Sequence, residues 1–72
     1  MEERQMEYTR EELQEAKRQI ASTLHKLRET IRTLEAKENA QRYKSQITLA
    51  RRRVEAFTIA CDLIERALSG AE

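Results

Sequence analysis

The chain has 72 residues, of which 38% are charged and 39% hydrophobic, and its formal net charge is +1. At this length a single core supplies only about 3 to 5 kcal/mol, and the near-zero charge excludes a global field that would attract nucleic acid or an anionic membrane. The single cysteine excludes an intrachain disulfide, and we find neither an apolar run of membrane-spanning length nor an apolar leader. We therefore expect one cytoplasmic domain.

The composition predicts an all-α protein, because the chain has no proline and one glycine and is rich in Ala, Glu, Lys, Leu and Arg. Thr9 and Glu12 fit a capping box, in which the threonine hydroxyl and the glutamate carboxylate each accept from the other residue's amide. Tyr8 and Leu13 are spaced for a hydrophobic staple beside this cap. The first helix is therefore predicted at about 10–37.

Apolar residues recur at alternating spacings of four and three, which is the heptad seam of a coiled coil. The first row is Leu13, Ile20, Leu24, Leu27, Ile31 and Leu34, with Lys17 interrupting it, and the second is Tyr43, Ile47, Ala50, Val54, Phe57, Cys61, Ile64 and Leu68. Between the rows, Asn39 is expected to end the first helix in the left-handed conformation or to cap the second. We predict a turn at about 38–40, a second helix at about 40–68, and a peripheral segment at 1–7.

Two helices of equal length with a short link predict an antiparallel hairpin. Folding the chain at the link sets Leu13 near Ile64 and the other seam residues against one another in order. It also allows Lys17 to lay its stem over the seam and to reach Asp62 or Glu65 with its ammonium. The whole chain is then a single helical-hairpin domain.

The second helix is too apolar to be covered by one neighbour. Its apolar arc spans roughly 220°, whereas that of the first helix spans roughly 120°. The additional residues form what we call the α2 flank: Leu49, Ala56, Ile59, Ala60, Leu63 and Ala67. A hairpin has no interior that could hide them, so we expect a homodimer that assembles through this flank into a four-helix bundle.

Charge is segregated along the expected hairpin. Residues 1–16 carry a net charge of −4 and residues 55–72 a net charge of −3, so the open end is acidic, while residues 26–54 carry +6 near the turn. An antiparallel dimer places each basic tip beside the acidic end of its mate, so we expect this orientation rather than the parallel one.

One alternative is a nucleic-acid-binding hairpin that uses bases near the turn. The candidate contacts are Arg42, Lys44, Arg51, Arg52 and Arg53. Three consecutive arginines span about 200° of a helix and cannot all face one groove, and no aromatic residue is interleaved among them for base stacking. We therefore expect a solvated face here and rank phosphate contact second.

A third reading is an adaptor or antitoxin-like subunit that uses the broad face of the second helix for a different protein. The expected hairpin dimer resembles, in topology along the whole chain, the Rop class of RNA-modulating proteins. That resemblance rests on no residue motif, so it favours RNA binding only slightly and assigns no site.

The sequence predicts no enzyme, cofactor or metal site. Cys61 occupies a seam position, where a small buried hydrophobe is expected. His25 lies off the seam, with Ser22 where the glutamate of a Glu-x-x-His metal motif would stand. Glu11 and Glu12 are explained by capping and by the helix dipole. The function expected is therefore structural or interaction-based.

Overall fold

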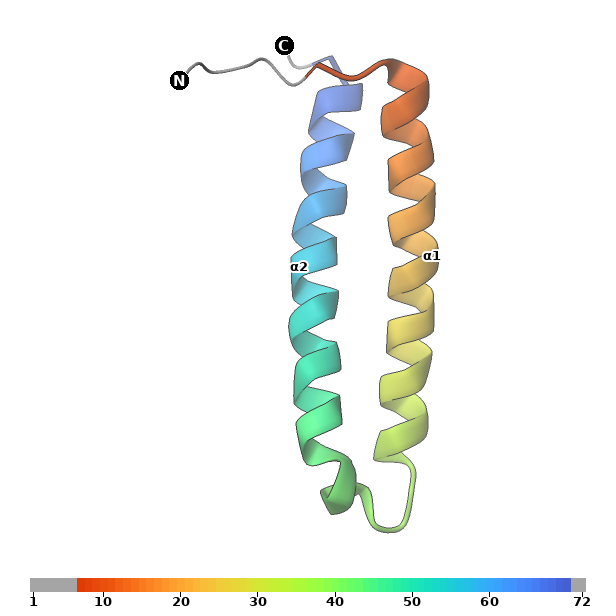
Figure 1. The fold of residues 1–72 in the computed structure, drawn as a ribbon, viewed down its shortest axis with the longest axis vertical. Coiled ribbons are helices and arrows are strands. Elements are labelled where there is room, and N and C mark those ends of the chain that lie inside the picture. The colour runs from red at the N-terminus through yellow and green to blue at the C-terminus, as the bar shows by residue number, and fades with distance from the viewer. Residues whose placement is uncertain (1–6, 71–72) are drawn as a thin grey trace.

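A computed structural model describes residues 7–70 and shows a helical hairpin (Figure 1). Helix α1 spans Arg10–Glu35, a short 3-10 helix η1 spans Ala40–Tyr43, and α2 spans Lys44–Leu68. The two α-helices lie side by side and antiparallel, with the start of α1 and the end of α2 at one end of a rod that measures 49 × 27 × 16 Å. The expected all-α hairpin is confirmed over this range, while most of the peripheral segment 1–7 lies outside the described residues.

The start of α1 is the predicted capping box. The Glu12 amide donates to Thr9 Oγ1 over 3.0 Å, and the Thr9 amide donates to Glu12 Oε1 over 2.9 Å. Tyr8 and Leu13 line a common depression beside this cap, together with Ile64 from α2. Local sequence therefore sets where α1 begins, as capping chemistry requires.

The link between the helices differs from its prediction. Helix α1 ends at Glu35, two residues early, and the chain turns through 36–39. Asn39 has φ −108°, which is not left-handed, and its side chain caps nothing. Its carbonyl instead accepts from the Arg42 amide over 2.9 Å. The chain therefore reverses through short-range bonds of 3-10 type. The left-handed conformation expected of Asn39 is wrong, whereas its expected N-cap position is found at the start of η1, which leads directly into α2, but without the side-chain bond.

Helix α2 ends as glycine chemistry predicts. Ser69 caps the helix, and its amide donates to the Glu65 carbonyl over 2.9 Å. Gly70 follows with φ +74°, a left-handed conformation that is available to glycine without steric cost. The end of α2 at Leu68 agrees with the expected boundary.

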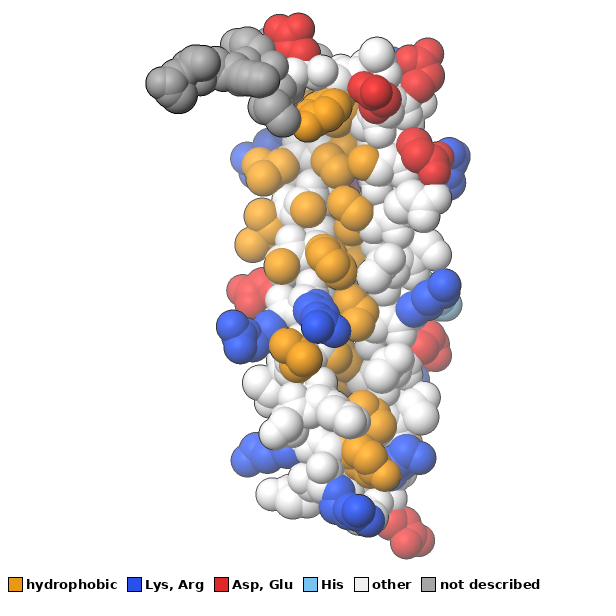
Figure 2. All heavy atoms as spheres, in the orientation of Figure 1, with side chains coloured by type: hydrophobic (Ala, Val, Ile, Leu, Met, Phe, Trp, Pro, Cys, Tyr) orange, Lys and Arg blue, Asp and Glu red, His pale blue; other side chains and the backbone are white. Residues whose placement is uncertain are grey.

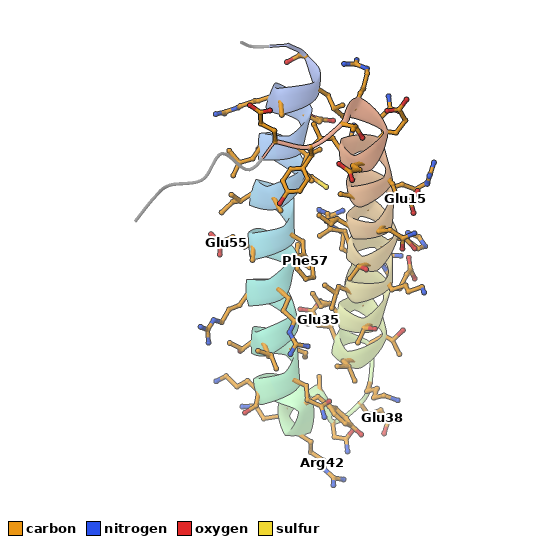
Figure 3. The ribbon with its side chains drawn as sticks, turned by 45° about the horizontal axis from the view of Figure 1, so that its top comes forward. Glu15, Glu35, Glu38, Arg42, Glu55 and Phe57 are labelled. Atoms are coloured by element: carbon orange, nitrogen blue, oxygen red, sulfur yellow. The ribbon has the colours of Figure 1, made fainter. Side chains whose placement is uncertain are left out.

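The core is one row of side chains along the line where the helices meet. Leu24 and Ala50 are buried at 7% exposure each, and no other residue within 7–70 is buried. All other predicted seam residues are half-buried, including Phe57, which projects from α2 toward α1 (Figure 3). The heptad prediction is thus confirmed, and the core it forms is thin.

Candidate functional site

The α2 flank holds three of the four large hydrophobic side chains that are exposed among residues 7–70. Leu49, Ile59 and Leu63 are 45%, 54% and 57% exposed. Ala56 and Ala67 are also exposed, whereas Ala60 is half-buried at the margin of the seam. Figure 2 shows apolar side chains over α2 that run on into the seam, most densely toward the end of the rod where α1 begins and α2 ends. The flank and the seam thus form one continuous apolar surface.

One side of the hairpin, which we call the bonded side, is crossed by polar bonds between the helices. Lys17 Nζ lies 2.6 Å from Glu65 Oε2, and Arg51 forms an ion pair with Glu35. At the open end, Arg10 Nη1 donates to the carbonyl of Leu68 over 3.0 Å. Residues 10 and 17 of α1 are seven apart and residues 17 and 35 are eighteen apart, which is about five full turns, so all three point to one side of α1. Residues 51 and 65 are fourteen apart and share one stripe of α2.

The opposite side of the hairpin, which we call the open side, faces the viewer in Figure 2. Its α1 stripe is Ala16, Thr23 and Thr30, seven residues apart and uncharged. No hydrogen bond or ion pair between side chains of the described residues joins α1 to α2 across this side. The α2 flank borders it, so the apolar surface lies away from the cross-helix ion pairs.

The grooves of the bonded side are lined mainly by charged side chains. One, of about 440 Å³, is bordered by Arg28, Ile31, Arg32, Glu35, Arg51, Val54 and Glu55. The other, of about 610 Å³, is bordered by Arg10, Lys17, Asp62, Glu65, Arg66, Leu68 and Ser69. In both grooves acids accompany the bases, so neither offers the enclosed, largely apolar pocket that small ligands prefer.

The candidate nucleic-acid residues are all exposed but do not share a face. Arg51 lies on the bonded side and is paired with Glu35. Arg53 is two residues further on, about 200° around the helix. Arg42 projects from the tip of the hairpin, away from both helices (Figure 3). The fold therefore spreads these charges around the molecule.

Within the described part of the chain, Glu15 and Lys17 have shifted pKa values, and both shifts come from hydrogen-bonded partners. The pKa of Glu15 lies below its ordinary value because Gln19 Nε2 donates to its carboxylate over 2.7 Å and Arg18 lies beside it. The pKa of Lys17 lies above its ordinary value because of the bond to Glu65. Both shifts favour the charged forms at neutral pH, whereas a general acid or base works best with a pKa near the working pH.

The side chains that could act as nucleophiles or metal ligands do not cluster among the described residues. Cys61 is a half-buried free thiol, and His25 is exposed. Among residues 7–70, no three His, Cys, Asp or Glu side chains gather where they could hold a metal ion. Neither α1 nor α2 has an apolar stretch long enough to cross a membrane.

Sequence reasoning anticipated Lys17 reaching Asp62 or Glu65, and the structure selects Glu65. It missed the Arg51 to Glu35 pair and the bond from Arg10 to the carbonyl of Leu68. A signal was available only for Arg10, which lies seven residues before Lys17 and therefore shares its side of α1.

No protein family model matches this chain, and no curated protein or solved structure is significantly similar to it.

Proposed function

We propose that this chain is a non-catalytic interaction protein that homodimerises through the α2 flank into a four-helix bundle. The observation that carries the proposal is the imbalance between what the hairpin buries and what it exposes. Among residues 7–70 it buries two side chains, Leu24 and Ala50, and leaves Leu49, Ile59 and Leu63 about half exposed on one helix.

The energetics favour association over an isolated hairpin. Fully burying a leucine or isoleucine contributes about 1.5 to 3 kcal/mol, so covering one that is half exposed contributes on the order of 1 kcal/mol. Each copy brings three such side chains to the interface. Their sum is comparable to the few kcal/mol that a core of this size supplies alone.

A second copy of the chain is the occupant best matched to this surface. The open end is acidic and the turn end basic, so an antiparallel mate sets unlike charges together at both ends. Exposed pairs contribute only about 0 to 1 kcal/mol each. Charge therefore selects the orientation, and apolar burial supplies most of the affinity.

The proposal is tested by Leu63→Lys, with Ala21→Lys as the matched control. Both positions are exposed, and both changes add one positive charge, but Ala21 lies on α1 away from the flank. Light scattering should show that Leu63→Lys dissociates the dimer, and circular dichroism should show that it loses helicity. Ala21→Lys should remain dimeric and helical.

Other outcomes of this experiment count against the proposal. A Leu63→Lys protein that is still dimeric and fully helical contradicts the assigned interface. A wild-type chain that is monomeric and poorly helical contradicts homodimerisation and supports the adaptor or antitoxin-like reading, in which a different protein covers α2.

Binding to nucleic acid is the second candidate, because several bases near the turn are exposed. Within residues 7–70 the structure records no ion pair for Arg42, Lys44, Arg52 or Arg53. Binding through phosphates would weaken steeply with salt. Salt-dependent retention on RNA that is lost when these residues become glutamine would support this function, and no retention at low salt would exclude it.

A further inference from the structure

The α2 flank contains a stripe that is symmetric about the middle of its helix. Leu49, Ala56 and Leu63 are spaced seven residues apart, so they lie in one row along α2. Helix α2 spans Lys44–Leu68, and its middle residue is Ala56. The two large apolar side chains of the row are therefore equidistant from the helix centre, with a small side chain between them.

This symmetry has a direct consequence for a twofold dimer. When two identical helices pair antiparallel, residues equally far from the axis on opposite sides face each other. Resting on the proposed homodimer, we propose that α2 pairs with α2 of a second copy in the register that places Ala56 at the twofold axis. Leu49 of each copy then packs against the partner's Leu63.

Neighbouring registers fit worse. Moving the axis by seven residues to Leu49 or to Leu63 leaves the other leucine beyond the end of the partner's α2, and only part of each helix overlaps. The register centred on Ala56 is the one in which both helices overlap over their full length. It also allows the closest approach of the backbones at the axis, where both copies carry only a methyl group.

Charge selects the same register. With Ala56 at the axis, the arginines at 51–53 lie opposite residues 59–61 of the partner, which are uncharged. A register centred on Arg52 would instead set the two arginine runs against each other, which is unfavourable. The ends also match, because Lys44 near the basic tip lies opposite residue 68 of the partner, in its acidic end segment.

The bonded side of each hairpin is unaffected by this pairing. Leu49 and Arg51 are two residues apart, so their side chains point about 160° away from each other around α2. The ion pair of Arg51 with Glu35 therefore faces away from the second copy. Folding of the hairpin and its pairing with a mate use different surfaces of α2.

Disulfide trapping tests the register in a Cys61→Ala parent, which removes the native thiol. A disulfide requires the two Cα atoms to approach within about 7 Å. With oxidised glutathione as the oxidant, Ala56→Cys should cross-link to itself. Leu63→Cys should not link to itself, but it should link to Leu49→Cys when the two proteins are mixed.

A second pair of cysteine positions tests the same register without replacing a leucine, in case the leucine changes prevent folding. Ser45 and Ala67 are small and exposed, and they are also equidistant from Ala56. Mixed Ser45→Cys and Ala67→Cys proteins should cross-link, whereas neither should link to itself. Non-reducing electrophoresis detects the products, and reduction with dithiothreitol should reverse them.

The possible results distinguish an incorrect register from the absence of a homodimer. If the parent is dimeric by light scattering but Leu63→Cys links to itself, or Ala56→Cys does not, the register is wrong and the homodimer stands. If the parent is monomeric while wild-type Cys61 protein is also monomeric, the proposed function fails and the register fails with it.

Discussion

Thr9 and Glu12 satisfy two backbone amides that have no partner inside α1, through bonds of 3.0 and 2.9 Å. In a rod whose core holds two buried side chains, such local bonds are a sizeable part of the total stability. The cap is therefore expected to matter more here than in a larger domain.

Thr9→Ala should lower the free energy of unfolding by about 1 kcal/mol, because it leaves the Glu12 amide without its acceptor. Thr33→Ala is the control, since Thr33 is exposed within α1 and alanine is the better helix former there. Urea denaturation measures both. Equal stability of Thr9→Ala and wild type would show that the cap contributes nothing in solution.

The stability of the hairpin should depend on pH through the ionisation of Glu15. Its pKa is lowered in the folded chain, so its contribution to stability is present above the unfolded value of 4.5 and is lost as the pH falls through the lower folded value. NMR titration of the carboxyl carbon should find the pKa below 4.5, and Gln19→Ala should raise it.

Gln14→Ala is the matched control, because Gln14 is also an exposed glutamine of α1 and the bond to Glu15 comes from Gln19. It should leave the Glu15 pKa low. If Gln19→Ala and Gln14→Ala give the same Glu15 pKa as wild type, the hydrogen bond from Gln19 does not form in solution.

At the scale of helices, the seam was predictable from sequence and the link was not. A heptad row such as Leu24, Leu27 and Ile31 depends only on helix periodicity and on the exclusion of water from one face. The conformation of Asn39 depends on how far apart the two packed helices must end. The chain closes that distance with the 3-10 turn Ala40–Tyr43, and no local motif encodes this choice.

The candidate site was also only partly predictable from the sequence. Helix periodicity was sufficient to place Leu49 and Leu63 outside the seam, and both are exposed in the hairpin. The pairing of Arg51 with Glu35 was missed, because long side chains reach across to residues that sequence register does not oppose directly. That pairing decides which of the three consecutive arginines is engaged within the hairpin.

Leu24→Ala tests the thin core. Leu24 is one of two buried side chains, and removing a buried leucine side chain costs about 2 to 5 kcal/mol. The variant should be largely unfolded by circular dichroism at concentrations where the wild type is helical. Leu68→Ala, at the half-buried end of the seam, should cost much less, and equal effects of the two changes would contradict a core centred on Leu24.

Lys17→Leu tests the one interruption of the seam. Leucine at this half-buried position completes the apolar row and should raise Tm by about 4 to 8 °C, the shift that about 1 kcal/mol produces in a domain of this size. Lys26→Leu, at an exposed position off the seam, should give no such rise. A lower Tm for Lys17→Leu would show that the bond to Glu65 outweighs apolar burial.

For the whole molecule, folding and association are expected to be coupled. A rod with a single row of half-buried side chains is marginal alone, and covering the α2 flank of each copy would stabilise both hairpins at once. By mass action, the Tm of a chain that folds as a dimer rises with its concentration. Calorimetry across a hundredfold concentration range should therefore give a shifting Tm, whereas an unchanged Tm would indicate a self-sufficient monomer.

Molar mass and helicity, measured together over a dilution series, show whether the hairpin folds only as a dimer. Sedimentation equilibrium at micromolar concentration should give twice the chain mass of 8.5 kDa, and dilution should reduce mass and helical signal together. A chain that sediments as a single copy at nanomolar concentration with its helicity intact would contradict the account, because Ile59 and Leu63 would then be exposed to water in a stable fold.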